Sequence, residues 1–142
     1  MKLIFTINKK ADIIFDYLTD MQKYVSVHPV ITRIKNKQKN YYLVYETLQL
    51  GFIPISFSYP ATVEGDKRNK TVNFQATIMK LATFEMQFLL HENGDHTIIE
   101  EIITIKSLLP IKGIMQRLFR KTHQELFNNI EKITDMTYIN KH

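Results

Sequence analysis

The chain contains no cysteine among its 142 residues, so disulfides, thiolate metal sites and cysteine nucleophiles are all excluded. Only four glycines are present, and none forms the phosphate-binding or dinucleotide-binding loops of nucleotide enzymes. No apolar run reaches the roughly 18 residues that suggest a membrane span, and the polar "TINKK" follows too soon for a secretion signal. We therefore expect a cytoplasmic protein with no metal and no cofactor.

What is present is an ordinary globular composition. Hydrophobic residues make up 44% of the chain and charged residues 23%, which is enough apolar material for a real core. The length suits one domain over residues 1–142, with a tail from about residue 135 that we expect to be frayed. The net charge of +5 is modest and spread along the chain. Without a recognisable binding module, this excess predicts no specific nucleic-acid partner.

The first thirty residues predict one strand and two short helices. Lys2–Ile7 is an apolar strand, and Asn8 can cap the helix that follows it. Thr19 and Gln22 have the spacing of a capping box, which indicates that a second helix starts there instead of the first continuing. Pro29 cannot continue that second helix. The apolar residues of the two helices recur at helical spacing: Ala11, Ile14, Phe15, Leu18, Met21, Tyr24 and Val25.

The middle of the chain predicts strands joined by turns. The Asn93-Gly94 pair is the strongest hairpin signal, and no helix separates the later strands, which favours antiparallel pairing. The chain then ends in an amphipathic helix expected from about Ile111 to Thr134. The six expected strands are Val30–Lys35, Tyr41–Leu50, Phe52–Val63, Thr71–Ile78, Ala82–His91 and His96–Ser107. With the first strand they make a seven-stranded antiparallel sheet.

This order of elements resembles the START-like or Bet v 1-like helix-grip superfamily, also called SRPBCC. The resemblance rests on "INKKADIIFDYLTDMQKYVSVHP" (Ile7–Pro29) and on the C-terminal amphipathic helix. Bacterial members of the superfamily include polyketide cyclase/dehydrase-type and coenzyme Q-binding proteins. The resemblance implies an α+β fold in which a curved sheet wraps around the long helix. It also implies an apolar cavity between them, which members use for lipids, sterols, quinones or polyketides.

Strand alternation selects the residues that would line such a cavity. One phase of each strand should face the helix, and large apolar residues on that phase are core residues at least as often as ligand contacts. Small residues such as Ala76 would leave space. The apolar candidates are Phe57, Tyr59, Phe74, Ala76, Phe84, Met86, Phe88 and Ile103 on the strands, with Met115, Leu118 and Phe119 on the helix.

Three polar residues complete the candidate site. Glu100 and Glu101 are adjacent on an isoleucine-rich strand, so one faces inward. The phase of Ile99 and Ile103 favours Glu101, but Ile98 and Ile102 fit the opposite phase, so the choice stays open. An inward carboxylate is costly unless it is paired or functional. His28 lies where the second helix gives way to strand, and a capping or loop-ordering role is the simpler interpretation. Tyr42 shares one face of its strand with Glu46, opposite Tyr41 and Tyr45, and the pattern leaves open which face points inward.

The function we predict is binding or transport of a hydrophobic or amphipathic small molecule between sheet and helix. One alternative is a cyclase or dehydratase that uses an inward Glu or His as acid or base, although no residue is assigned as catalytic. A second alternative is a partner-binding module that acts through basic side chains. Those side chains are Lys35, Lys37, Lys39, Arg117, Arg120 and Lys121. The ligand's identity and the oligomeric state are left open.

Overall fold

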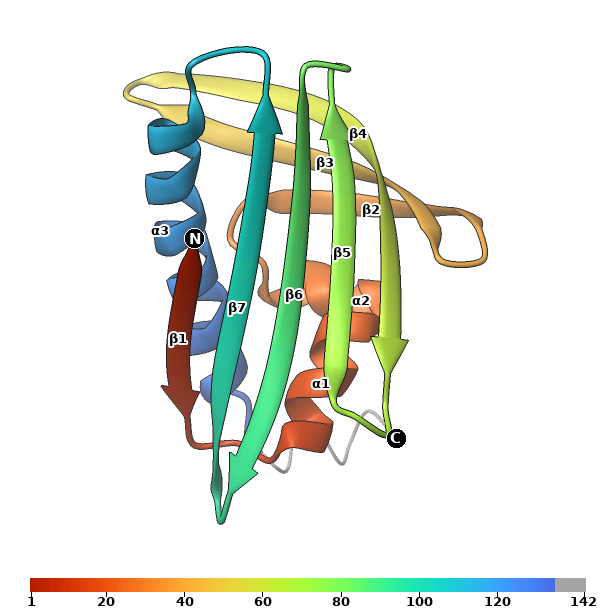
Figure 1. Cartoon of the computed structure of the whole chain (residues 1–142), viewed down its shortest axis with the longest axis vertical. Coiled ribbons are helices and arrows are strands. Elements are labelled where there is room, and N and C mark those ends of the chain that lie inside the picture. Colours follow the sequence, from red (N-terminus) through yellow and green to blue (C-terminus); the bar gives the residue numbers. More distant parts are fainter. Residues whose placement is uncertain (135–142) are drawn as a thin grey trace.

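The structure is a computed structural model that describes residues 1–134 (Figure 1). The frayed tail expected from about residue 135 lies outside the described residues. Its strands are β1 (Lys2–Ile7), β2 (Ile31–Gln38), β3 (Tyr41–Leu50), β4 (Ile53–Asp66), β5 (Thr71–Ile78), β6 (Ala82–Asn93) and β7 (His96–Ser107). Its helices are α1 (Ala11–Thr19), α2 (Met21–Val27) and α3 (Lys112–Glu131).

The seven strands form one sheet in the order β1-β7-β6-β5-β4-β3-β2, and all neighbours are antiparallel. The sheet curves around α3, and α1 and α2 bridge the two edge strands β1 and β2 (Figure 1). The predicted α+β helix-grip architecture is confirmed. Hairpin succession explains the order, because each strand from β2 to β6 pairs with the strand that follows it.

Strand alternation decides which residues reach the interior. In β7, every second residue from Thr97 to Ile105 is buried, while Ile102 is 38% exposed. Glu101 belongs to the buried phase and is fully buried. Glu100 points to the outer face, where it forms a salt bridge with Lys2, with 2.9 Å between Lys2 Nζ and Glu100 Oε1. The inward phase that the isoleucine pattern favoured is therefore the observed one.

The two short helices form as expected, but their caps differ from the prediction. Lys10, not Asn8, is the N-cap of α1, and its side chain makes no capping hydrogen bond. The Ala11 N–H donates instead to a carboxylate oxygen of Glu92 on β6, at 2.9 Å. Asp20, not Thr19, caps α2 by accepting from two backbone N–H groups. The Thr19 hydroxyl donates back to the Phe15 carbonyl within α1. The capping-box spacing therefore located the helix break correctly and assigned its capping residue one position too early.

Helix α3 packs on the concave face, and its fully buried residues all lie in its second half. Leu126, Phe127 and Ile130 are fully buried, and the Phe127 ring lies 4.8 Å from Phe5 and 5.8 Å from Phe88 between centroids. The apolar stripe expected along the whole helix therefore fails at its start, where Ile114 is 55% exposed. The first turn of α3 is exposed and lies toward the upper end of the molecule in Figure 1.

The β3–β4 hairpin opens the sheet at that same end. Strand β4 pairs with β5 only from Ala61 to Asp66, whereas its first half, Ile53–Pro60, pairs with β3 alone. The β3–β4 hairpin therefore bends away from the rest of the sheet and passes across the upper end of the concave face (Figure 1).

Candidate functional site

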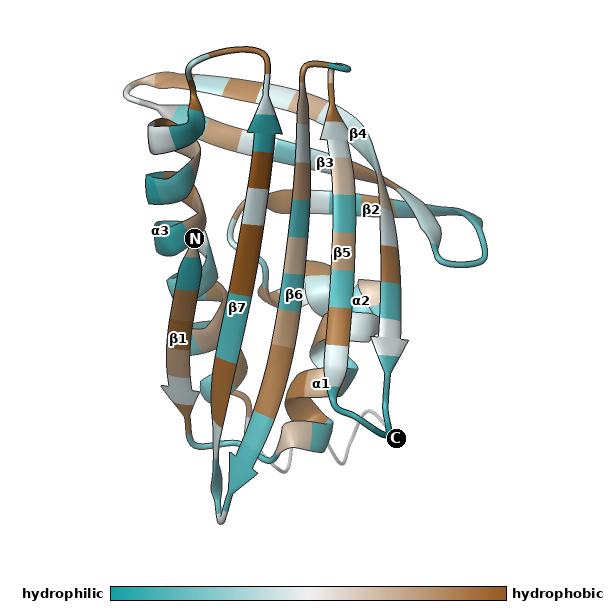
Figure 2. Ribbon diagram, in the orientation of Figure 1, coloured by the Kyte–Doolittle hydropathy of each residue, from teal (hydrophilic) through white to brown (hydrophobic). Residues whose placement is uncertain are grey.

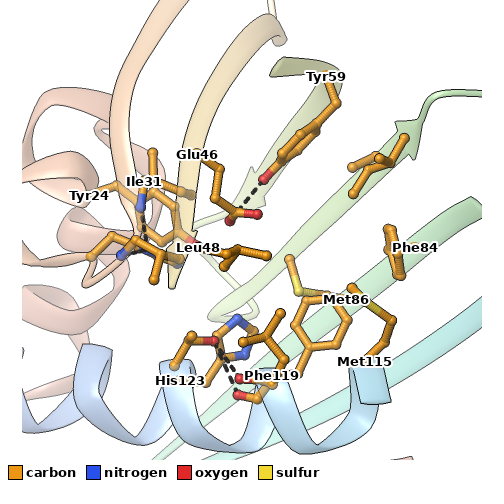
Figure 3. A pocket seen from close by; sticks show the side chains of 16 residues that line it. Tyr24, Ile31, Glu46, Leu48, Tyr59, Phe84, Met86, Met115, Phe119 and His123 are labelled. Carbon is orange, nitrogen blue, oxygen red and sulfur yellow. Dashed lines mark hydrogen bonds between the residues drawn. The ribbon is translucent and has the colours of Figure 1, made fainter. Parts of the chain in front are cut away.

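A cavity of about 50 Å³ lies between the concave face of the sheet and the first half of α3. Figure 3 shows its walls, with Phe84 and Met86 from β6 opposite Met115 and Phe119 from α3. Its lining residues are Tyr24, His28, Val30, Ile31, Glu46, Leu48, Tyr59, Ala76, Ile78, Phe84, Met86, Met115, Leu118, Phe119, Thr122 and His123. The walls are mostly apolar with a few polar groups, which is the usual make-up of a small-molecule site.

A second cavity of about 40 Å³ adjoins the first. Both are lined by Tyr24, Ile31, Tyr59, Ala76 and Met86. Because Met86 is half-buried and methionine side chains are flexible, a shift of this one side chain can connect the two spaces.

Glu46 and Tyr59 form the first polar pair on the cavity wall. Their side chains point toward one another (Figure 3), and the Tyr59 hydroxyl donates to the Glu46 carboxylate over a long 3.5 Å. Burial raises the pKa of Glu46 to about 7, against the opposing effects of Tyr59 and His123. Burial and the neighbouring Glu46 raise the pKa of Tyr59. The open question of the β3 faces is settled, since Glu46 lines the cavity and Tyr41 is 41% exposed.

Glu101 and His123 form the second pair, at the base of the cavity. The His123 Nδ1 lies 2.8 Å from Oε1 and 2.6 Å from Oε2 of Glu101, and both side chains are almost completely buried. No other donor reaches this carboxylate within residues 1–134. With Glu101 ionised, its carboxylate can only accept hydrogen bonds, and the imidazole proton of His123 then lies on Nδ1. The other ring nitrogen, Nε2, is then the atom that His123 can offer to the cavity.

His28 is oriented by the start of β2. Its Nδ1 accepts from the backbone N–H groups of Val30 and Ile31 at 3.2 and 3.1 Å. The neutral ring therefore carries its proton on Nε2. Burial, with a smaller effect from His123, lowers the pKa of His28 and keeps it neutral. Its ring centroid is 5.1 Å from that of Tyr24 and 6.3 Å from that of His123, so the three polar side chains cluster at one side of the cavity.

Ten of the fourteen residues singled out from the sequence border one of the two cavities. Those on the first cavity are His28, Tyr59, Ala76, Phe84, Met86, Met115, Leu118 and Phe119, and those on the second include Tyr42 and Phe74.

Four predicted residues line neither cavity, and each has a packing reason. Phe88 and Ile103 belong to the hydrophobic core and are almost completely buried. Glu101 lies behind His123 and reaches the cavity only through that imidazole. Phe57 is half-buried against the Tyr59 ring, 5.9 Å away between centroids. Phe88 and Ile103 show that the inward phase of a strand includes both core and cavity positions.

The sequence did not single out Tyr24, Thr122 or His123 as site residues, and it left open whether Glu46 faces inward, yet all four line the first cavity. A usable signal existed for His123, which lies four residues after Phe119 and three before Leu126, on the apolar stripe of the helix. Tyr24 was placed on the apolar face of its helix, but that spacing predicts burial without distinguishing core from cavity.

The basic residues considered as a partner surface do not form one cluster. Lys35, Lys37 and Lys39 are on β2 and its turn to β3, whereas Arg117, Arg120 and Lys121 are on α3. Figure 1 shows the β2–β3 turn on the opposite side of the molecule from α3.

No family model and no curated protein matches this sequence, but solved structures match its fold. A START superfamily protein from Mycobacterium smegmatis has a TM-score of 0.75 at 15% identity and covers 92% of this chain and 93% of its own. Ara h 8.0201 has a TM-score of 0.75 at 13% identity, over 100% and 97% of the two chains. The Zhui aromatase/cyclase from Streptomyces sp. R1128 has a TM-score of 0.70 at 8% identity, over 92% and 90%.

These similarities extend over nearly the whole length of both chains, and at such low identity they show the fold alone. The chain has the START-like, Bet v 1-like helix-grip fold that its order of elements suggested. Within residues 1–134, no helix is both long and apolar enough to cross a bilayer. The same residues contain no group of three or more carboxylate or histidine side chains placed to hold a metal ion.

Proposed function

We propose that this protein binds a hydrophobic or amphipathic small molecule, of the lipid, quinone or polyketide-like kind, in the space between the sheet and α3. The observation that carries the proposal is an apolar cavity into which a few polar side chains converge, among them Tyr24, His28 and His123. Apolar walls favour the ligand's hydrocarbon part and the polar cluster selects its head group. We also propose that the protein is cytoplasmic, because a chain without cysteine fits a reducing compartment.

The size of the cavity restricts how such a ligand enters. About 50 Å³ holds only a few water molecules at roughly 10–15 Å³ each, while typical ligand pockets measure roughly 300–1,000 Å³. Binding therefore requires the half-buried Met86, Met115 and Phe119 to move outward. Long, flexible methionine side chains lower the energetic cost of this rearrangement.

The test is to fill the cavity. Ala76→Leu places a larger side chain on the shared wall of both cavities, so the affinity for the apolar fluorophore anilinonaphthalene sulfonate should fall about tenfold or more, which equals about 1.4 kcal/mol. Native mass spectrometry of the purified chain should also show an apolar molecule retained by the wild type and lost from the variant.

Ala82→Leu is the matched control. Ala82 is similarly buried, 5% against 9% exposed for Ala76, but it borders neither cavity. Both variants should lose comparable stability through overpacking, about 1–3 kcal/mol, and only Ala76→Leu should lose probe binding. Equal probe binding by all three proteins, with nothing retained in the native spectrum, would refute the proposal.

An acid–base enzyme is the second candidate, and the buried Glu101–His123 pair is what favours it. A carboxylate that fixes Nδ1–H of a histidine leaves Nε2 as a general base. In this reaction Nε2 would accept a proton from a carbon next to a carbonyl. The resulting enolate oxygen would then accept hydrogen bonds from the Nε2–H of His28 and the Tyr24 hydroxyl.

Deuterium exchange distinguishes the enzyme from the carrier. A catalytic protein should speed incorporation of solvent deuterium into the methylene group of a β-diketone, and His123→Gln should lower that rate by at least about a hundredfold. A carrier should give the same rate as buffer, with or without the substitution. His91→Gln, which alters an exposed histidine outside the cavity, serves as the control.

A further inference from the structure

Exposed apolar side chains gather at one end of the molecule. Among the eleven large hydrophobic residues that are exposed in the described chain, only Ile4, Tyr41 and Ile102 lie elsewhere. The other eight are on three connections: Phe52, Ile53 and Ile55 at the β3–β4 turn, Met79 and Leu81 at the β5–β6 turn, and Leu108, Leu109 and Ile114 at the start of α3. We call these eight residues the apolar tip.

The three connections of the apolar tip belong to one surface. The Leu108 N–H donates to the Leu81 carbonyl at 3.0 Å, which joins the β7–α3 connection to the β5–β6 turn. Leu48 of β3 and Met115 of α3 line the same cavity, so the end of β3 that leads into the β3–β4 turn lies near the start of α3. Figure 2 shows hydrophobic residues on the upper connections, where Figure 1 places all three at the same end.

Exposure at the tip is extreme for a protein surface. Phe52 is fully exposed, Leu108 is 81% exposed and Met79 is 73% exposed. Scattered single hydrophobic residues are normal, but a contiguous apolar patch usually marks an interaction site.

The charges around the tip are all of one sign. No aspartate or glutamate occurs in residues 47–63, 71–84 or 102–124, the segments that contain the three connections. The same segments carry Lys80, Lys106, Lys112, Arg117, Arg120 and Lys121, and no ion pair engages these side chains within residues 1–134. α3 also begins without an acidic residue in its first turn, so its positive N-terminal end adds to this field.

We propose that the apolar tip docks on an anionic lipid surface, with its exposed side chains in the headgroup region and its basic side chains against the phosphates. Apolar side chains flanked by lysine and arginine are the usual composition of an interfacial membrane anchor. A second copy of the chain fits less well, because two equally cationic tips would repel each other. The proposal goes beyond ligand binding and stands without it, although docking would also bring the cavity opening to the source of a lipid ligand.

A tryptophan reporter tests which part of the surface inserts. The chain has no tryptophan, so Phe52→Trp gives one site-specific signal at the tip and Ile4→Trp gives a matched one on the outer face, 63% exposed in the native residue. With vesicles of three parts phosphatidylcholine to one part phosphatidylglycerol, the emission of Phe52→Trp should shift to the blue and resist acrylamide quenching. The emission of Ile4→Trp should not change.

Vesicle sedimentation then tests the energetics. The double variant Phe52→Ser, Leu108→Ser should lose at least about tenfold in partition coefficient, whereas Ile4→Ser, Ile102→Ser, which also removes two exposed apolar side chains, should lose none. The double variant Lys80→Gln, Lys112→Gln should lose about tenfold in partition coefficient at low salt. The double variant Lys37→Gln, Lys39→Gln, on the opposite side of the molecule, should lose little. High salt should weaken wild-type binding.

Three results would overturn the proposal. The first is no binding to the anionic vesicles. The second is equal binding to vesicles of phosphatidylcholine alone, which would remove the role of the basic side chains. The third is a dimer, found by sedimentation equilibrium without lipid, that Phe52→Ser, Leu108→Ser converts to monomer, since the tip would then be a self-association face. None of these results bears on the cavity-filling test, so the two proposals fail separately.

Discussion

At the scale of single residues, the main feature is that polar side chains are placed on an otherwise apolar interior. Glu101 and His123 are buried together, which is far less costly than burying either one alone. Glu46 has only the long hydrogen bond from Tyr59, so burial raises the pKa of its carboxyl group. Such poorly compensated groups reduce stability, and they persist in proteins chiefly at functional sites.

Glu46 should make stability depend on pH in a defined window. Its pKa rises from 4.5 to about 7 on folding, so the folded state binds more protons between those values and stability falls as pH rises through them. At about 1.4 kcal/mol per pKa unit, the loss is at most roughly 3 kcal/mol. Glu46→Gln removes it, so urea unfolding should show the variant gaining stability over the wild type between pH 5 and pH 8.

The variant must be compared with the wild type at each pH, because the lowered pKa of His28 changes stability with pH in the opposite direction to Glu46. A histidine that stays neutral when folded makes stability rise with pH up to its unfolded value. Glu125→Gln, at an exposed position of α3, is the control and should differ from the wild type equally at both pH values. A Glu46→Gln difference that is the same at pH 5 and pH 8 would contradict the prediction.

At the scale of elements, the close approach of α1 to the sheet is set by one glycine. A Cβ at Gly65 of β4 would lie 2.7 Å from Thr19 Cγ2 and 2.9 Å from the Phe15 ring atom Cζ, both on α1. Gly113, in the first turn of α3, has no atom within 4 Å of the same position. The first glycine therefore lets a helix touch the sheet, and the second has no packing role.

These two glycines should respond oppositely to the same substitution. Gly65→Ala forces α1 away from β4 and should destabilise by about 1–3 kcal/mol. Gly113→Ala lowers the backbone entropy cost of the helix and should stabilise by about 0.5 kcal/mol. Thermal unfolding of both variants measures the difference. A stable Gly65→Ala protein would mean that α1 is not held at this distance in solution.

At the scale of the whole molecule, the structure divides into a packed end and an open end. β7 is paired on both sides, by β1 and β6, and α3 buries its second half at that end. The opposite end consists of the two-stranded part of the β3–β4 hairpin and the exposed first turns of α3. Rearrangement during ligand entry or lipid docking is therefore expected at the open end, where fewer apolar contacts resist it.

Amide hydrogen exchange should reproduce this division. Residues of β6 and β7 between Phe84 and Ile105 should exchange slowest, while residues 48–58 and 108–118 should exchange orders of magnitude faster. An apolar ligand or anionic vesicles should slow exchange in the two fast segments and leave the slow strands unchanged. Uniform exchange along the chain, mapped by mass spectrometry of peptic fragments, would show that the two ends unfold as one unit.

The sequence alone determined the architecture because its signals are local. Alternation in the strands, the Asn93-Gly94 hairpin signal and the helical spacing of the two short helices each depend on neighbours within a few residues. The same alternation favoured Glu101 as the inward residue and, with the helical spacing of α3, selected many of the apolar residues that border the cavities. It could not separate cavity from core at Phe88 or Ile103, because both positions share one phase.

Only the tertiary structure decided which groups meet. His123 joins Glu101 from 22 residues away and Glu46 meets Tyr59 across 13, and the three connections of the apolar tip come from separate parts of the chain. Periodicity states which side of an element a residue faces, not what lies opposite. What lies opposite depends on the curvature of the sheet and the position of α3, and these follow from the packing of all the elements together.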